Sequence, residues 1–123
     1  MSAPKRSQSA AQKKAPLKMT PAALDKLAAV FRVLGDGGRL KLLQELKERE
    51  KTVSELVTLS GMGQTVVSKH LKLMHQARLL SRQKEGVRVI YAVSDPVVFQ
   101  LCELVCGKLN REKEEMQGIE YMI

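Results

Sequence analysis

The sequence predicts a mainly α-helical domain with five helices and one small β-hairpin. Apolar residues recur at helical spacing in several segments, and residues able to cap a helix precede most of them. Between residues 52 and 80, a short capped segment, a glycine turn and a second helical segment follow one another. An alternating, β-branched segment comes next. This order of elements predicts a winged helix-turn-helix.

The composition indicates one small globular domain with a basic surface. The chain has 123 residues, of which 44% are hydrophobic but only 3% aromatic, so we expect a modest aliphatic core and association with a second copy. The net charge of +8 makes nucleic acid the first partner to consider and an anionic membrane surface the second. No apolar run approaches the ~18 residues of a membrane span. Since a secretory signal core is also absent and two cysteines cannot form a disulfide framework, we expect a cytoplasmic protein with reduced thiols.

The first 18 residues are expected to form a disordered basic tail. They contain five basic residues and no acidic one, and they cannot bury enough surface to offset the entropy of ordering. Such a tail either improves solubility or serves as an arm that touches phosphates or a minor groove. The winged helix-turn-helix and dimerisation domain would then span residues 19–116. Residues 117–123 would form a C-terminal tail that packs on a partner or stays loose.

Capping residues mark the expected helix starts. Thr20 with Pro21 opens the first helix and Asp36 the second, and the charged segment of residues 48–51 is expected to be a loop. Thr52 and Glu55 have the spacing of a capping box, which opens a short third helix. The turn at residues 61–63 leads into a fourth helix with one apolar stripe formed by Val67, Leu71 and Met74.

The end of the chain predicts a wing and a last helix. Glu85-Gly86 is a turn pair between two strands, the second of which alternates Val87, Val89, Tyr91 and Val93 with Arg88, Ile90 and Ala92. Residues 97 to about 115 then form a helix that is apolar on nearly all sides over its first part. Since one small core can cover only one side of this helix, we expect a second subunit on the other.

The outward face of the fourth helix is the candidate functional surface. It carries hydrogen-bonding and cationic groups but no carboxylate, whereas an ordinary solvated face, which is the alternative interpretation, mixes both signs. Such a face suits the major groove of DNA, where Gln64 can pair with adenine and Lys69 can reach guanine or a phosphate. The remaining expected contacts come from this helix, from the start of the third helix and from the wing: Thr65, Ser68, His70, Lys72, Thr52, Arg82, Lys84 and Arg88.

The segments LAAVFRVLGDGGRLKLLQEL and TVSELVTLSGMGQTVVSKHLKLMHQARLLSRQKEGVRVIYAVSDP resemble the ArsR/SmtB-type winged-helix repressors. The shared features are the step from Leu34-Gly35-Asp36 into a helix beginning with Arg39, the residues 67–73 of the reading helix, and a wing that ends in Tyr91. The resemblance covers roughly residues 20–109. It implies a homodimer built on the first and last helices, which represses transcription at an imperfect palindrome until an inducer releases it.

The resemblance also raises the question of an inducer site. Relatives that sense metal use a Cys-x-Cys motif near the third helix or Asp and His pairs on the last helix. This chain has neither, so we expect no metal site and no cofactor. His70 matches a common family position and is interpreted as a packing or phosphate-contact residue. Arg78 stands where relatives usually have glycine.

Cys102 and Cys106 lie one helical turn apart and resemble a thiol-sensing branch of the family. In that branch, a last-helix cysteine matching Cys106 pairs with a second-helix cysteine, but Gln44 stands at the matching position here. Three interpretations remain open: small buried residues at the dimer interface, a redox or persulfide sensor, and thiolate metal ligands.

Other classes of function find less support in the sequence. There is no catalytic arrangement and no phosphate-binding glycine loop, so we expect no enzyme. RNA binding would call for aromatic stacking platforms, which the sequence lacks. The alternatives kept are a winged helix that binds protein, and a regulator with no ligand switch.

Overall fold

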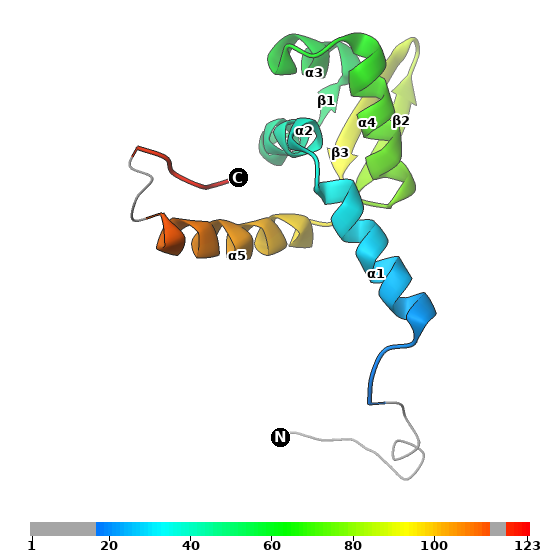
Figure 1. Ribbon diagram of the computed structural model, residues 1–123. Helices are drawn as coiled ribbons and strands as arrows, with labels where there is room; N and C mark the ends of the chain where they lie inside the picture. The colour runs from blue at the N-terminus through cyan, green and yellow to red at the C-terminus, as the bar shows by residue number, and fades with distance from the viewer. Residues whose placement is uncertain (1–16, 114–117) are drawn as a thin grey trace. The chain divides into compact units, whose positions relative to one another are not determined.

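The computed structural model describes residues 17–113 and 118–123, and it contains the five expected helices. The helices are α1 (Pro21–Leu34), α2 (Gly37–Glu48), α3 (Val53–Ser60), α4 (Gln64–Gln76) and α5 (Val97–Glu112), and the strands are β1 (Lys51–Thr52), β2 (Leu80–Glu85) and β3 (Arg88–Val93) (Figure 1). The chain divides into two compact units between residues 31 and 32, so the last turn of α1 belongs to the unit that contains all later elements. Of the predicted basic tail, only residues 17 and 18 lie within the described residues.

Local capping explains where the helices begin. The side chains of Thr20, Asp36 and Asp95 accept backbone N–H groups at the starts of α1, α2 and α5, at distances of 3.0–3.1 Å. These amides have no partner inside their own helices, so a side-chain oxygen stabilises each start by about 1 kcal/mol. Pro21 is the first residue of α1, as predicted.

The wing is a β-hairpin within a three-stranded antiparallel sheet. Strands β2 and β3 pair from Leu80 opposite Val93 to Glu85 opposite Arg88. Gly86 occupies the turn with a φ of 62°, a conformation that favours glycine. These observations confirm the predicted hairpin.

One part of the sheet differs from the prediction. Residues 51–52, expected to belong to a charged loop and a helix cap, form β1 and pair with β3, which becomes the central strand. The alternation predicted for β3 also fails to divide buried from exposed residues, because Ile90 and Tyr91 are neighbours in sequence and both are buried. A two-residue strand has no periodicity of its own, so its pairing with a distant segment could not be found from sequence.

The core of the larger unit is aliphatic. Helix α4 packs on α2, α3 and β2, and its predicted inner stripe is fully buried. The largest fully buried side chains are Leu42, Leu43, Leu56, Val67, Leu71, Met74 and Leu80. Each such side chain stabilises the fold by roughly 1.5–3 kcal/mol relative to leaving it exposed, so the apolar stripe holds α4 firmly against the rest of the unit.

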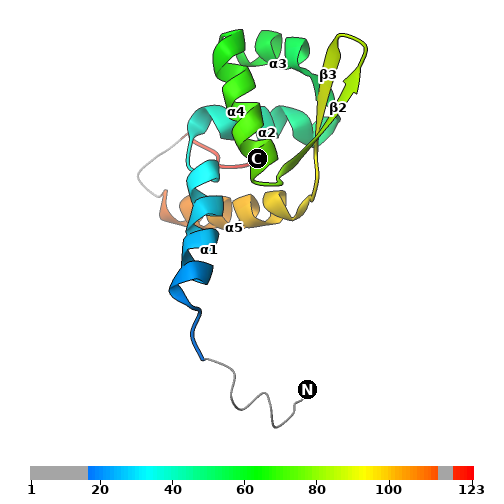
Figure 2. The same ribbon diagram turned by 90° about the vertical axis from the view of Figure 1, so that its right-hand side faces the viewer.

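The last six described residues fold back along α5 and reach α2. The Asn110 side chain accepts the Tyr121 N–H and donates to the Tyr121 carbonyl, both at 2.9 Å. The Lys47 ammonium on α2 donates to the backbone oxygen of Ile123 at 2.7 Å. Figure 2 shows this C-terminal segment between α5 and α2. Residues 118–123 therefore connect the two helices, mainly through backbone atoms of the segment.

Candidate nucleic-acid interface

Polar side chains gather on the outward side of α4. Five of the predicted contacts line one open surface depression, together with Leu73 and Gln76: Gln64, Thr65, Ser68, Lys69 and Lys72. The helix carries no acidic residue over its whole length. Phosphate oxygens or base edges could therefore approach this row without meeting a carboxylate on α4.

Helix α3 and the following turn support α4 from one side. Gly61 ends α3 with a φ of 74°, in the left-handed region that favours glycine. The buried Ser60 hydroxyl accepts the Met62 N–H at 3.1 Å and so orders the turn. The two helices thus form the predicted helix-turn-helix.

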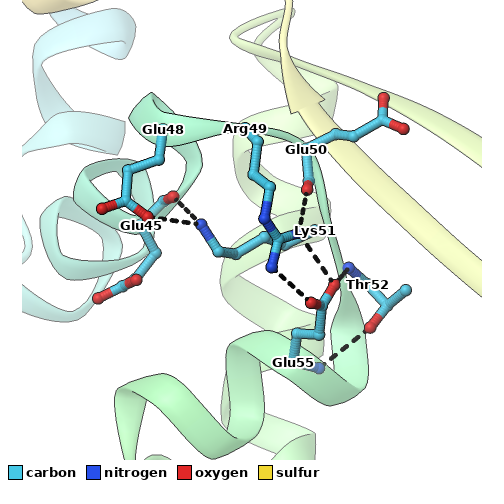
Figure 3. Close-up of polar contacts among 7 residues, drawn as sticks. All are labelled: Glu45, Glu48, Arg49, Glu50, Lys51, Thr52 and Glu55. Atoms are coloured by element: carbon cyan, nitrogen blue, oxygen red, sulfur yellow. Dashed lines mark hydrogen bonds and ion pairs between the residues drawn. The ribbon is translucent and has the colours of Figure 1, made fainter.

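The start of α3 holds Thr52 in a dense polar corner (Figure 3). Its hydroxyl accepts the Glu55 N–H at 3.1 Å and its N–H donates to the Glu55 carboxylate at 2.9 Å, which confirms the capping box. Arg49 adds an ion pair of 2.8 Å to that carboxylate. The hydrogen bond from Arg49, followed by that from the Thr52 N–H, lowers the pKa of Glu55 to about 2. Thr52 therefore keeps its hydroxyl proton as the group that it can offer to a phosphate.

Lys51 is buried in the same corner, in a segment that the sequence predicted to be a charged loop. Just 3% of the residue is exposed. Its ammonium donates to the Glu45 carbonyl at 2.5 Å and lies 3.3 Å from the Glu48 carboxylate (Figure 3). Since the last carbonyls of a helix lack partners within it, Lys51 caps the C-terminus of α2.

The wing presents its three predicted cations on two different faces. Directly opposite residues share a face and successive residues alternate, so Arg82 and Lys84 lie on one face and Arg88 lies with Glu85 on the other. All three cations are exposed. Arg88 also lines a small pocket that includes Thr52. The wing therefore offers a pair of cations on one side and a single cation near the start of α3 on the other.

His70 lies apart from the polar row, on a flank of α4. Its side chain is only 15% exposed and faces the N-terminus of α2. Nδ1 is 3.3 Å from Nη1 of Arg39, and Nε2 is 3.7 Å from Oδ1 of Asp36. The Arg39 N–H, which that aspartate caps, is the main cause that lowers the pKa of Asp36. This placement favours the packing interpretation of His70 over a direct phosphate contact.

Helix α4 ends on a left-handed arginine. Arg78 has a φ of 64° and is the one non-glycine residue with positive φ among the described residues. The Leu79 N–H reaches the Met74 carbonyl and the Arg78 N–H reaches the His75 carbonyl, both at 2.9 Å. This is a Schellman motif, which normally has glycine at the position of Arg78. Arg78 therefore adopts a backbone conformation that favours glycine.

Comparison with known proteins identifies the family of this chain. Residues 36–82 match the family described as "Bacterial regulatory protein, arsR family". The arsenical resistance operon repressor of Bacillus subtilis is 34% identical over 95 residues, which cover 75% of this chain and 89% of the relative. The chain belongs to the ArsR family.

Two further proteins are similar over much of the chain. The "Probable mercury resistance operon repressor" of Streptomyces lividans is 39% identical over 80 residues, or 65% of this chain and 64% of the relative. The solution structure of a homodimeric winged helix-turn-helix DNA-binding domain from Mycobacterium bovis superimposes with a TM-score of 0.68 at 27% identity, covering 85% of this chain and 100% of that one. The chain spans less than two thirds of several curated relatives, including 55% and 37% of two from Mycobacterium tuberculosis.

The names of the Streptomyces and Bacillus relatives mention mercury and arsenic, yet this ArsR-family chain offers no matching site in the residues described. Within residues 17–113 and 118–123, no group of three or more His, Cys, Asp or Glu side chains could hold a metal ion. The segment that leads into α3 supplies Lys51 and Thr52 rather than thiols. The described residues also contain no helix both long and apolar enough to cross a membrane.

The two cysteines lie on α5 as free, half-buried thiols. Burial raises the pKa of Cys102, and the neighbouring Cys106 and Glu103 raise it further. A raised pKa lowers the thiolate fraction at neutral pH, and the thiolate is the reactive form. For Cys102, this environment favours a packing role over a reactive thiolate.

Proposed function

We propose that this ArsR-family chain is a sequence-specific DNA-binding transcriptional regulator, acting as a homodimeric repressor that an inducer releases from its operator. The observation that carries the proposal is the outward row of α4, where five polar or cationic side chains share one surface depression and no carboxylate interrupts them. A helix in the major groove needs such a row, because carboxylates there would face phosphates.

The proposed roles follow from the chemistry of each side chain. Gln64 would pair with adenine, and Lys69 would reach guanine or a phosphate. Thr65, Ser68 and Lys72 would bond base edges or the sugar-phosphate backbone. On the wing, Arg82 and Lys84 would contact the flanking backbone or minor groove. Arg88 and Thr52 would meet a phosphate near the start of α3.

Self-association follows from apolar surface on two helices, each taken by itself. On α5, Leu104 is 73% exposed, and Val97 and Val105 are about half exposed. On α1, Leu24, Leu27 and Phe31 are 42–50% exposed. Burying both surfaces against a second copy would remove them from water, and a two-fold dimer would read an imperfect palindrome of two half-sites.

The remaining features are proposed on the same basis. Residues 19–116 would form the DNA-binding and dimerisation domain, and the basic tail of residues 1–18 would add solubility or a further phosphate contact. The protein would act in the cytoplasm and without enzymatic activity. The inducer would act on the dimer rather than through a metal site among the described residues.

A gel-shift titration with the promoter DNA next to the gene tests the proposal. The expected result is a discrete shift whose affinity falls steeply with salt, since each neutralised phosphate releases a counterion. A scrambled duplex of equal length serves as the control. Equal affinity for both duplexes at every salt concentration would contradict sequence-specific binding and would favour the alternative, a winged helix that binds protein.

The half-buried thiols favour an inducer other than an oxidant or persulfide. The Cys102→Ser/Cys106→Ser double variant is therefore expected to bind DNA as the wild type does, with or without a persulfide donor. If the donor released the wild type but not the variant, the thiols would be the switch after all. A wild type that no added compound releases would instead be a regulator with no ligand switch.

A further inference from the structure

We propose that Arg39 and His70 form a positioning pair that fixes the reading helix α4 against residues 32–36. These residues form the corner where α1 ends and α2 begins. This inference rests on the proposed DNA-binding function and adds to it. Side chains that read base edges must be held within about 0.5 Å of their working positions. The buried stripe of α4 is apolar, and apolar packing has no preferred direction. A directional contact on its flank is what sets the rotation of α4 about its own axis.

Arg39 is well placed to provide a fixed reference for that contact. Its Nε donates to the Val33 carbonyl and its Nη2 to the Arg32 carbonyl, the latter at 3.3 Å. Both carbonyls belong to the last turn of α1, where the regular i to i+4 hydrogen bonds of the helix end, and the Arg32 carbonyl also accepts the Gly35 N–H at 3.2 Å. The guanidinium of Arg39, a residue of α2, therefore caps the C-terminal end of α1. The plane of the fork leaves Nη1 directed at Nδ1 of His70, 3.3 Å away.

The identity of the donor indicates which tautomer a neutral His70 ring adopts. A guanidinium has no acceptor, so Nδ1 must accept the hydrogen bond and the ring proton must lie on Nε2. Nε2 faces Oδ1 of Asp36 at 3.7 Å, where the carboxylate attracts the N–H group. Both ring nitrogens are thus directed at the first turn of α2 and none at the outward row of α4. The ring acts on DNA only through the helix that carries it.

Gly38 supplies a second and independent observation. A Cβ atom at this position would lie 3.0 Å from Nε2 of His70 and 3.1 Å from the sulfur of Met62. Glycine therefore allows the His70 ring to approach the backbone of α2, while Met62 closes the site from the turn between α3 and α4. The pair lies where the α1–α2 corner, the turn and the reading helix meet.

The test compares variants of the pair on DNA that the wild type itself selects from a random duplex pool. His70→Leu is expected to weaken binding to the selected duplex by about tenfold or more, since base readout needs accurate placement. Binding to a scrambled duplex and the dependence of affinity on salt should stay as in the wild type, because the phosphate contacts remain. A residue that touches phosphate itself would lower both affinities and reduce the salt dependence.

Two matched variants separate the Arg39 contact from the rest of the ring. Asn at position 70 can present an acceptor near the place of Nδ1, whereas Gln presents its amide near the place of Nε2. His70→Asn should therefore retain more selected-duplex affinity than His70→Gln. In a double-variant cycle, Arg39→Lys together with His70→Leu should weaken binding clearly less than the product of the two single effects.

Each outcome decides between the hypotheses. Equal losses for Asn and Gln, or independent effects of Arg39 and His70, would overturn the positioning pair. Thermal unfolding of each variant shows whether a loss of DNA affinity merely reflects an unfolded protein. If His70→Leu does not fold, the comparison is made between the two milder variants, Arg39→Lys and His70→Asn. If the wild type selects no sequence from the pool, it is the DNA-reading function that fails, and not the pair.

Discussion

Lys51 and Lys69 have the same side chain and opposite surroundings. Lys51 is buried, and its ammonium bonds to the end of α2 and lies against the Glu48 carboxylate. Lys69 is exposed on α4 in a row that carries no acidic residue, and the described residues provide it with no ion pair. The buried polar corner between α2 and α3 is satisfied by the protein itself. The outward row of α4 is left for a partner, and this difference distinguishes groups that support the fold from groups that bind.

The largest effect on stability is expected at the buried lysine, Lys51. Lys51→Ala should lower the free energy of unfolding by about 2–3 kcal/mol, because it removes a buried stem and leaves the Glu45 carbonyl without its partner. Chemical denaturation measures the change. Lys51→Met keeps most of the apolar stem and isolates the loss of the ammonium. The control is Lys41, an exposed lysine on α2. Lys41→Ala should change the free energy of unfolding by less than about 0.5 kcal/mol.

Lys69→Ala should show the opposite pattern. Affinity for operator DNA is expected to fall about tenfold, which is about 1.4 kcal/mol, while the unfolding midpoint stays unchanged. Fluorescence anisotropy with a labelled duplex measures the affinity. Lys108→Ala on α5 removes an equal charge far along the chain from the row. If both variants lost the same affinity, overall charge would explain binding and the row would have no special role.

Arg78 sharpens the comparison, since it is a cation whose backbone rather than its charge is under constraint. Arg78→Gly should raise the free energy of unfolding by about 1 kcal/mol, because glycine adopts a φ of 64° without steric conflict. Arg78→Ala is the matched control, which removes the cation but keeps the Cβ. Equal stabilisation by both variants would attribute the effect to charge instead of conformation.

The smallest effect is expected from Glu55, which lies in the satisfied corner but near solvent. Its pKa is lowered from 4.5 to about 2, so its contacts stabilise the folded state above pH 4.5, and this contribution is lost as the pH falls toward about 2. Glu55→Gln should therefore flatten the decline of the melting temperature over this interval. Glu45→Gln on α2, which removes a carboxylate outside the Arg49–Glu55 ion pair, is the control and should leave this decline of the melting temperature as in the wild type. A decline as steep in Glu55→Gln as in the wild type would assign the acid sensitivity to other carboxylates.

Most of the fold could be predicted because its signals are local. Capping residues such as Thr20 and Asp36 act within one turn of the helix that they start, so the sequence carries the information directly. The inner stripe of α4 repeats at helical spacing for the same reason. The outward row could be predicted with it, since residues that do not face the core must face outward.

The contacts that sequence analysis missed all join distant segments. Strand β1 exists because β3 pairs with it, and Lys51 is buried because that pairing carries it under α2. The contact between Arg39 and His70 joins residues 31 positions apart. Arg39 was identified in the sequence as part of the step that follows the Asp36 cap. No local signal indicated that its guanidinium would contact both the end of α1 and His70 on α4. The two wing faces likewise depend on the strand register.

The two hydrogen bonds between the Asn110 side chain and the backbone of Tyr121 have a practical use. Because Asn110 and Lys47 recognise main-chain atoms, the outward side chains of residues 118–123 can be exchanged with little effect on how the segment is held. Met122 is 73% exposed and stands next to the residue that Lys47 holds. An environment-sensitive fluorophore attached there would report optically on any separation of α2 from α5 when an effector arrives.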